Sequence, residues 1–328
     1  MTESALDRLR TQLIHLAFAE STHANRKSHL NFYVRFCADY HYNPFPIQAL
    51  VASRYVAFLA SCGRKYGTIL NHIASLKHFH QFRGFQLGWE KDYHFSLALQ
   101  GLKRYLGNTV NRKSAITPSM LIAVSTCFDL SCPLHAAMWA LFLVAFFSFL
   151  RKSNLVIGAA ADSKKVLCRS DLVFTDTGAQ LSVRETKTIQ YKQRTLSIPL
   201  PLISGSRLCP ISALRNHLKV NQIASHEPLF SVSSLSNASL LSPVTYSQFT
   251  RFLKQSIAAI GEDPAVFSPH SFRRGGATFA FECGLPAEFI KIHGDWRSDA
   301  YLVYLEMTEA QKHKAAMDMA HQIHQQQL

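Results

Sequence analysis

The segment SPHSFRRGGATFAFECG at residues 268–284 contains residue types that can bind and activate a phosphate. Its Ser-Pro pair is typical of a helix start, and His270 and Arg273, three residues apart, would share one face of that helix. A cation and an imidazole at the positive end of a helix favour a phosphate site. Gly275 and Gly276 would let a neighbouring backbone approach closely. Because His-x-x-Arg is common by chance, a solvated basic helix start is the alternative.

Four further residues extend this candidate site along the chain. Arg151 directly follows the apolar run of residues 136–150, Lys187 stands near the turn of a predicted hairpin, and Trp296 and Tyr304 stand in GDWRSDAYLVYLE. Each has an alternative reading. Arg151 can cap a helix, Trp296 can be a core aromatic, Lys192 and Arg194 compete with Lys187, and Tyr301 competes with Tyr304, although we expect Tyr301 to be buried against the helix.

In this order, the motifs resemble those of the tyrosine recombinase (phage integrase) family. The amino-acid sequences HSFRRGGATFAFECG and GDWRSDAYLVYLE are most similar to those of the Crypton-type recombinases of eukaryotic mobile elements. The motifs lie between residues 145 and 305, and a helical DNA-clamping domain before them is the family's usual arrangement. The resemblance therefore extends over nearly the whole chain.

The resemblance implies strand exchange in double-stranded DNA with no metal, nucleotide or other cofactor. Tyr304 would attack a phosphodiester, form a 3′-phosphotyrosyl link and free a 5′-hydroxyl. Arg151 and Arg273 would hold the non-bridging oxygens, whose negative charge grows in the transition state. Lys187 would protonate the leaving oxygen, and His270 would accept the tyrosine proton or donate to the phosphate. The indole N–H of Trp296 would hydrogen-bond the phosphate.

The chain departs from the family pattern in three places. Many members carry an acid three residues after the first arginine, where this chain has Asn154, whose amide can still orient Arg151. The usual interval of nine residues before the tyrosine leads to Asp295, which would repel a phosphate, so Trp296 is assigned the role and His293 is a second candidate. Arg274 doubles the basic residue and would contact a neighbouring phosphate or face solvent.

Composition supports a nucleic-acid partner. The chain has a formal net charge of +14, and residues 1–113 hold 15 Lys and Arg against 6 Asp and Glu. Such an excess favours a polyanion, and no basic amphipathic segment suggests a membrane surface instead. The apolar run of residues 136–150 is too short for a bilayer and predicts a buried helix. Seven cysteines without a C-x-x-C pair, and no secretory leader, indicate an intracellular protein with reduced thiols and no zinc site.

The predicted fold is mainly α with a small antiparallel β-sheet, in the two-domain architecture that the resemblance implies. Residues 1–106 predict a helical core-binding domain, residues 107–116 a linker, and residues 117–328 an α+β catalytic domain. Thr117-Pro118 predicts a helix start, and two or three strands are expected around the turn at residues 176–178. Residues 231–243 are expected to form a loop. The C-terminal segment predicts a helix with an apolar stripe, which would pack on its own domain or on a neighbouring protomer.

Three functions remain open from the sequence. The first is an active site-specific recombinase or transposase, acting as a homodimer or tetramer on DNA. The second is a DNA-binding protein derived from such an enzyme that no longer cuts. The third is a topoisomerase IB-like enzyme that relaxes supercoils through the same phosphotyrosine. The similarity to eukaryotic elements implies a nuclear location.

Overall fold

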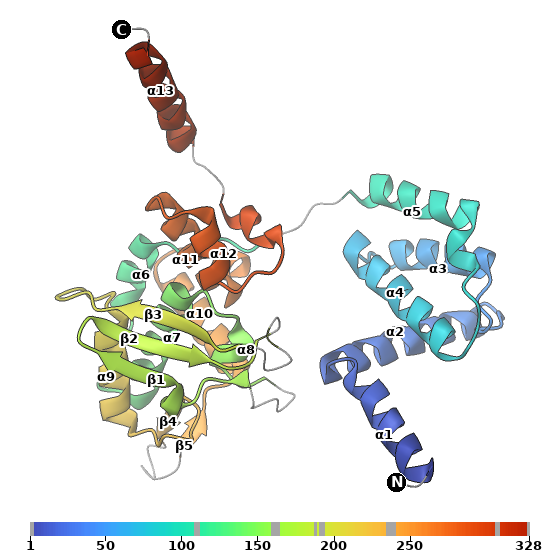
Figure 1. The fold of residues 1–328 in the computed structure, drawn as a ribbon, viewed down its shortest axis with the longest axis horizontal. Coiled ribbons are helices and arrows are strands. Elements are labelled where there is room, and N and C mark those ends of the chain that lie inside the picture. Colours follow the sequence, from blue (N-terminus) through green and yellow to red (C-terminus); the bar gives the residue numbers. More distant parts are fainter. Residues whose placement is uncertain are drawn as a thin grey trace. The chain divides into compact units, whose positions relative to one another are not determined.

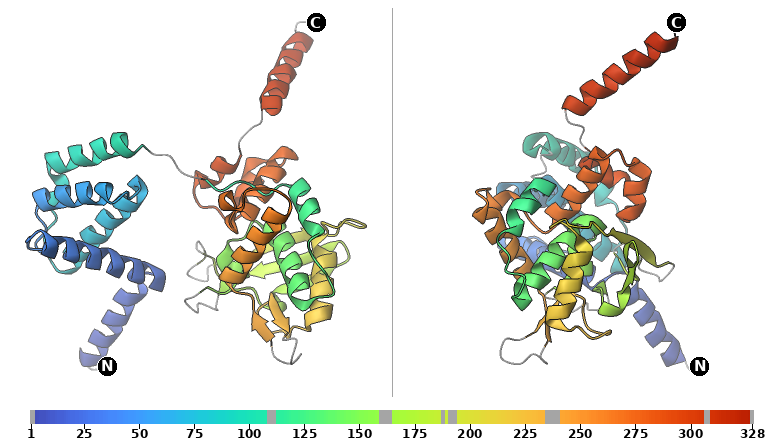
Figure 2. Two further views of the ribbon diagram at one scale, coloured as in Figure 1. Left: turned by 180° about the vertical axis from the view of Figure 1, so that it is seen from behind. Right: turned by 90° about the vertical axis from the view of Figure 1, so that its left-hand side faces the viewer.

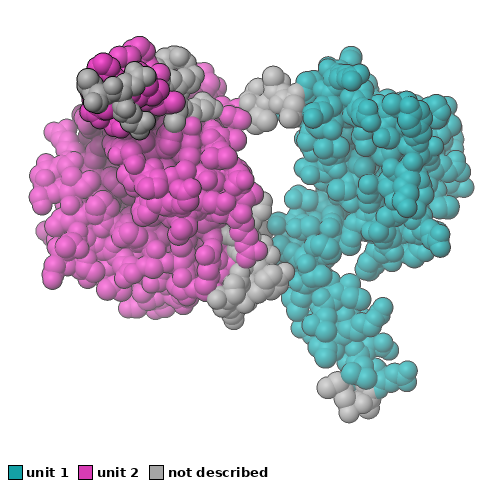
Figure 3. Space-filling model, turned by 45° about the horizontal axis from the view of Figure 1, so that its top comes forward, with its two compact units in different colours: residues 1–111 teal, residues 112–328 magenta. Residues whose placement is uncertain are grey.

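The computed structural model describes residues 3–107, 112–158, 165–186, 189, 194–233, 241–305 and 309–326. Within these ranges the chain is mostly helical and contains two small antiparallel sheets (Figure 1). The predicted fold class is therefore confirmed. The chain divides into two compact units, Met1–Asn111 and Arg112–Leu328, which Figure 3 colours teal and magenta. No helix in the described ranges is both long and apolar enough to cross a bilayer.

The first unit is built from helices alone. These are α1 (Glu3–Leu16), α2 (Glu20–Asp39), α3 (Ala49–Ser61), α4 (Tyr66–Phe82) and α5 (Tyr93–Leu106), with the short 3₁₀ helix η1 (Trp89–Lys91) before α5. Helices α2 to α5 meet in a core rich in aromatic side chains, including Tyr33, Phe36, Tyr55, Trp89 and Phe95. Helix α1 adds no buried residue to this core. The helical part of the sequence prediction for residues 1–106 agrees with this arrangement.

The second unit is organised around a fully buried helix. Helix α7 (Pro133–Ser148) is apolar on all its faces, as the run at residues 136–150 predicts, and it is buried along nearly its whole length. It ends at Ser148 because Phe149 adopts a left-handed conformation with φ of 51°. Helix α9 (Pro210–Asn221) and helix α11 (His270–Glu282) pack against α7. The end of α7 therefore lies where the predicted catalytic segments meet.

A three-stranded antiparallel sheet lies beside α7. It consists of β1 (Leu172–Thr175), β2 (Gly178–Val183) and β3 (Leu196–Pro201) in the order β1-β2-β3, with Leu181 opposite Ile198. Helices α7 and α9 cover one face of the sheet (Figures 1 and 2), which explains the alternating burial along β3. The strands and the turn that joins β1 to β2 agree with the prediction.

A second sheet was not predicted. Strands β4 (Ser231–Ser233) and β5 (Leu241–Pro243) pair antiparallel, so the expectation of a loop throughout residues 231–243 is wrong. The strands are three residues long, Ser-Val-Ser and Leu-Ser-Pro, which is too short for a period to be detected in the sequence. Their pairing depends on the packing of β4 against α7 and α9.

Further helices complete the second unit. They are α6 (Pro118–Ser125), α8 (Lys152–Leu155), η3 (Arg169–Asp171), α10 (Tyr246–Ala259), η4 (Pro264–Val266), α12 (Ala287–His293), η5 (Asp299–Tyr304) and α13 (Glu309–Gln326). Thr117 caps α6, as predicted, by accepting a hydrogen bond from Met120 N at 3.2 Å. On α13, the predicted C-terminal helix, Ala316, Met319 and Ala320 are exposed.

Residues 113–116 of the predicted linker are held by the second unit. Ser114 N donates to Val266 O at 2.8 Å, Ile116 N donates to Ser271 O at 3.2 Å, and Arg274 Nη1 donates to Lys113 O at 2.7 Å. Arg274 therefore anchors the start of this unit, a role that its sequence position did not reveal.

Candidate active site

Helix α11 sits unusually close to its neighbours, and two glycines allow it. A side chain added at Gly275 would overlap the backbone oxygen of Ile116, and one added at Gly276 would overlap the oxygen of Phe146 and the ring of Phe149. The close approach predicted for this Gly-Gly pair is therefore confirmed. It brings the first turn of α11, with His270 and Arg273, against the end of α7.

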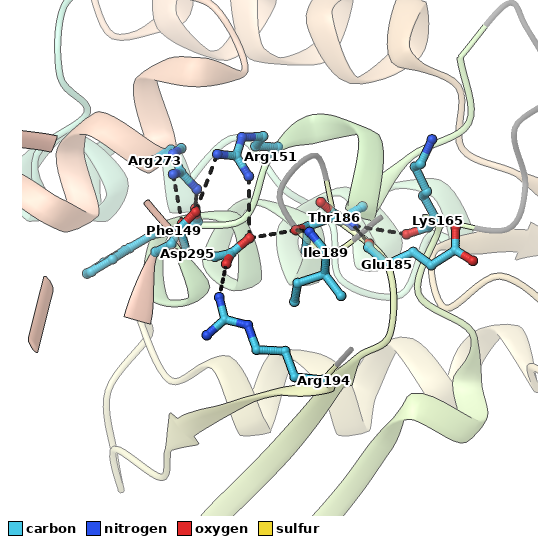
Figure 4. Close-up of polar contacts among 11 residues, drawn as sticks. Phe149, Arg151, Lys165, Glu185, Thr186, Ile189, Arg194, Arg273 and Asp295 are labelled. Carbon is cyan, nitrogen blue, oxygen red and sulfur yellow. Dashed lines mark hydrogen bonds and ion pairs between the residues drawn. The ribbon is translucent and has the colours of Figure 1, made fainter. Parts of the chain in front are cut away.

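Arg273 is the most deeply buried charged side chain at this junction. It is 2% exposed, and its guanidinium donates to the backbone oxygens of Phe149 and Gly294, the latter at 2.8 Å (Figure 4). These two carbonyls belong to segments that end α7 and α12, so the guanidinium joins both to α11. Its orientation is fixed by the fold before any ligand binds.

Arg151 precedes the first turn of α8 and lies near the guanidinium of Arg273. Its side chain is 23% exposed, and its Nη1 lies 3.8 Å from Oδ2 of Asp295. The sequence alternative, in which Arg151 caps the preceding helix, is wrong because α7 ends at Ser148 and Arg151 turns toward residue 295 instead. A second guanidinium is thereby brought beside that of Arg273.

The two guanidiniums carry the electrostatic signature of an anion site. Burial, and after it the positive charge of Arg151, lowers the pKa of Arg273 to about 9. Burial also lowers the pKa of Arg151. Both groups remain charged at neutral pH, and a bound anion would relieve their mutual repulsion. This arrangement suits a phosphate between them.

Tyr304 reaches this cluster from η5. Its phenol oxygen lies 2.7 Å from Nε2 of His270, and its backbone oxygen accepts a hydrogen bond from Thr278 Oγ1 at 2.8 Å. Helix α11 therefore holds the tyrosine at both ends, through His270 on its first turn and Thr278 two turns later. Thr278 had no signal in the sequence, because a Thr within a helix is ordinary.

The electrostatic surroundings of His270 favour its neutral form. Burial of the ring lowers the pKa of His270, and the charges of Arg273 and Arg151 lower it further. A neutral imidazole at hydrogen-bond distance from a phenol can accept the phenol proton. The pair therefore has the geometry of a nucleophile and its base.

Trp296 lies within the site, but with a different contact from the one predicted. Its ring stacks on the guanidinium of Arg273, with Cζ 3.7 Å from the ring centroid, and its centroid is 5.7 Å from that of Tyr304. A stacked Trp limits the rotation of the guanidinium and excludes water from it. The expected contact of its indole N–H with a phosphate stays a prediction.

The competing residues take other positions. His293 turns toward the end of α7, where its Nε2 lies 2.9 Å from Phe147 O, so it does not face Tyr304. Tyr301 is buried, 6% exposed, against α11 and α12 as expected. Lys187 and Lys192 lie outside the described residues. Arg194, the third basic candidate of this segment, pairs with Asp295 through Nη2 at 2.5 Å from Oδ1.

Asp295 and Asn154 correct two sequence interpretations. Asp295 does not face an incoming phosphate as a repulsive charge, because it is 3% exposed and contacts Arg151, Arg194 and Thr186. Asn154 does not orient the Arg151 guanidinium, because the hydrogen bonds of its Nδ2 go to the backbone oxygens of Lys165 and Glu185. The interval of nine residues before Tyr304 pointed to Asp295. The effect of its charge could not be predicted, because the residues that it contacts are distant in sequence.

Comparison with known proteins connects this geometry to a class. No family model matches the chain. In sequence, the chain is 25% identical over 228 residues to a protein described as an integrase/recombinase xerD homolog from Selenomonas ruminantium. That match covers 68% of this chain, and the chain spans 63% of the length of that relative.

Solved structures share the fold over most of the chain. The Tn1549 transposon integrase in complex with transposon right end DNA has a TM-score of 0.62 at 15% identity, covering 94% of this chain and 97% of that one. A lambda integrase fragment, solved as a dimer bound to a COC′ core site, has a TM-score of 0.61 at 16% identity, covering 93% and 95%. The XerH site-specific recombinase bound to a palindromic difH substrate has a TM-score of 0.59 at 14% identity, covering 83% and 72%.

The fold is that of the two-domain tyrosine recombinases. The sequence match, at 25% identity, is to a protein described as an integrase/recombinase, and so points the same way as the fold.

Proposed function

We propose that the chain is a DNA strand-exchange enzyme, a site-specific tyrosine recombinase or transposase. The observation that carries the proposal is the contact of 2.7 Å between the phenol oxygen of Tyr304 and Nε2 of His270, beside the guanidiniums of Arg151 and Arg273. A nucleophile, a base and two anion-binding groups are the parts that phosphoryl transfer to a protein hydroxyl requires.

The reaction would proceed by in-line displacement at a DNA phosphate. Tyr304 Oη forms a bond to phosphorus while the bond from phosphorus to the 5′-oxygen breaks. The phenol proton passes to His270, and the leaving 5′-oxygen takes up a proton to become a hydroxyl. The 3′-phosphotyrosyl link retains the energy of the broken bond, so the reverse attack by a 5′-hydroxyl rejoins DNA without an energy source.

The two guanidiniums would act on the transition state. Negative charge accumulates on the two non-bridging oxygens as the fifth bond to phosphorus forms, and Arg273 and Arg151 stabilise it. Because Arg273 is held by two carbonyls and by Trp296, little reorganisation is needed when the charge develops. Lys187 is proposed as the acid for the leaving oxygen on the strength of the family resemblance alone.

The substrate would be double-stranded DNA, held by both units as a homodimer or tetramer. The excess of basic residues in residues 1–113 supports a DNA-clamping role for the first unit. From the resemblance to Crypton-type elements we propose in addition a mobile-element origin and a nuclear location. Imaging of a fluorescently tagged chain in eukaryotic cells tests the location, and an even distribution between nucleus and cytoplasm would contradict it.

A covalent trapping assay tests the activity. Duplexes bound by the protein are first selected from a random library, and nicked versions that lose a short fragment after cleavage are then prepared from them. Wild type should form a protein–DNA adduct on a denaturing gel, and Tyr304→Phe should form none. Arg273→Ala should also form none while keeping most of its DNA affinity, because one phosphate contact is a small share of binding.

The two alternative functions predict different results in binding, trapping and plasmid-relaxation assays. Tight binding of the selected duplex by wild type, with no adduct, supports a DNA-binding protein that no longer cuts. Relaxation of a supercoiled plasmid of arbitrary sequence supports a topoisomerase IB-like enzyme. Equal loss of affinity and of adduct in Arg273→Ala would contradict the role assigned to Arg273.

A further inference from the structure

We propose that Asp295 is a positioning residue of this site. Its carboxylate orients Arg151 and joins it to Thr186 and Arg194, and it takes the place of the acid that the chain lacks at position 154. The inference rests on the proposed function and names a further residue on which the reaction depends.

The contacts of Asp295 are directed at one arginine and at the segments around it. Oδ2 lies 3.8 Å from Arg151 Nη1, and the backbone oxygen of the same residue lies 3.5 Å from Arg151 Nη2. Oδ2 accepts a hydrogen bond from Thr186 Oγ1 at 2.5 Å, and Oδ1 lies 2.5 Å from Arg194 Nη2. Figure 4 shows Asp295 between the three side chains. Both terminal nitrogens of Arg151 are thus placed by one residue.

Asp295 stands at a backbone position where a negative charge is unfavourable. The residue follows α12 with a left-handed φ of 53°, where Gly or Asn is the usual choice. Its N–H donates to Ile292 O at 3.1 Å, so it closes the C-terminal end of a helix, where a negative charge is unfavourable. The position of Asp295 at this helix end therefore costs some stability. The nearby cations offset the cost of the charge.

The Asp295 carboxylate offsets the repulsion between two nearby guanidiniums. Arg151 and Arg273 repel one another, and Arg151 is only partly shielded by water because its side chain is 23% exposed. The side chain of Asp295 is 2% exposed, so its charge acts on Arg151 through protein and not through solvent. Without it, the Arg151 guanidinium would lose its fixed orientation. It would still attract a bound phosphate, but it would no longer be held where the transition state needs it.

Position 154 cannot supply this charge in the present fold. Asn154 is buried, and its Nδ2 donates to Glu185 O at 2.7 Å and to Lys165 O at 3.1 Å. A carboxylate placed there would face these two backbone oxygens instead of Arg151. We therefore expect that Asn154→Asp does not restore the activity of an Asp295 variant.

The experiment compares Asp295→Asn with Asp299→Asn in the full chain. Asp299 is a matched control because it lies four residues away, is exposed and pairs with Lys291 at 2.9 Å, outside the site. Three quantities are measured: the rate of adduct formation on the selected nicked duplex, the dissociation constant of inorganic phosphate, and the Nε–Hε signal of Arg151 in ¹⁵N-arginine-labelled protein. Arg151→Lys assigns that signal.

The proposal predicts opposite changes in rate and in phosphate affinity. Asp295→Asn should lower the rate on the order of 10²-fold, because Arg151 no longer meets the transition state. It should bind inorganic phosphate several-fold more tightly, because a negative charge near the site is removed. The Arg151 signal should shift, and Asp299→Asn should leave all three quantities as in wild type. A residue that only supports folding would lower the rate and the affinity together.

Two results would overturn the proposal. One is an Arg151 signal and a cleavage rate in Asp295→Asn that equal those of wild type. The other is a parallel loss of rate and phosphate affinity in soluble, folded Asp295→Asn. If Asp295→Asn does not fold, Thr186→Val replaces it, since this change removes the hydroxyl donor and keeps the charge. Thr186→Val should then slow adduct formation several-fold at unchanged phosphate affinity, and a wild-type rate would contradict the proposal.

Failure of the proposed function is recognised separately. In that case wild type forms no adduct on DNA that it binds. The phosphate and Arg151 measurements do not depend on cleavage, so they still decide whether Asp295 positions Arg151.

Discussion

At the residue scale, His270 determines how Tyr304 can be activated. Its ring contacts the phenol at 2.7 Å, and it stands near several positive charges, among them Arg273, Arg151 and Lys152. Burial first, and then these charges, lower the pKa of His270 below its ordinary value of 6.5. At neutral pH the imidazole is therefore neutral and is ready to accept a proton.

This pKa shift predicts the pH dependence of cleavage. Protonation of His270 removes the base, so the rate of adduct formation should be constant near neutral pH and should fall only below pH 6.5. Removing a positive charge raises the pKa, so Lys152→Gln should move the acidic limb to higher pH. The rate of adduct formation is measured from about pH 4.5 to about pH 8. The range extends roughly two pH units below the ordinary histidine pKa, so that it includes the acidic limb.

Lys219→Gln is the control for that experiment. Lys219 is exposed on α9, carries the same charge and is not among the groups that act on His270. Its profile should match that of wild type. An acidic limb above pH 7 in wild type, or one that does not respond to Lys152→Gln, would rule out His270 as the base.

At the element scale, α11 is the part on which the site depends. It carries His270, Arg273 and Thr278. It packs against the end of α7 through Gly276, and Gly275 lies against the backbone of Ile116. The helix can deliver its side chains to the end of α7 only if the two backbones nearly touch. The packing of this one pair of helices therefore sets the geometry of the nucleophile and of the anion site together.

The same substitution should have opposite effects at two helical glycines. Gly275→Ala adds a methyl group where the backbone of Ile116 stands, and should destabilise the second unit by at least about 2 kcal/mol. Gly101→Ala lies in α5 with open space around it, and should stabilise the first unit by about 1 kcal/mol through helix propensity.

Urea unfolding followed by hydrogen–deuterium exchange assigns each transition to its unit. Equal stability of Gly275→Ala and wild type would show that α11 can move away from the backbone of Ile116, contrary to the packing described.

Particular elements show how far sequence reasoning reached. The buried helix α7 was predictable because its apolar residues form a continuous run, and the turn before β2 was predictable from its residues. The pairing of β4 with β5 was not predictable, because strands of three residues are too short to show a periodic pattern. In the site, Arg151, Arg273 and Tyr304 were found from ordered motifs. Thr186 and Thr278 had no signal in the sequence, and Arg194 was expected only as an alternative to Lys187, because the residues that they contact are distant along the chain.

At the scale of the whole molecule, charge is distributed unevenly between the two units. Residues 1–113 carry 15 basic against 6 acidic residues, whereas residues 114–328 carry 20 against 15. Contacts with DNA phosphates release counterions, so affinity for any duplex should fall steeply as salt rises. The first unit should account for a large part of that dependence.

Neutralising two exposed cations of α5 tests this expectation. The double variant Lys103→Gln and Arg104→Gln should bind a random duplex more weakly, and should reduce the slope of log affinity against log salt by about 2. Fluorescence anisotropy between about 50 and about 300 mM salt measures the slope, because log affinity falls linearly with log salt. Lys219→Gln, which removes one exposed positive charge of the second unit, is the comparison. An equal change per removed charge in the two variants would argue against DNA contact by α5.

The sequence by itself determined the class of fold, the order of the candidate motifs and the excess of positive charge that led us to expect a polyanionic partner. Periodicity, motif order and net charge are properties of the chain that need no coordinates. The tertiary structure alone decided which charges meet. Asp295 interpreted from the sequence is a carboxylate that repels phosphate, yet in the fold it is enclosed by Arg151, Arg194 and Thr186. The physical reason is that the effect of a charged side chain depends on the groups around it in space. Arg151, Thr186 and Arg194 are each more than 100 residues from Asp295 along the chain.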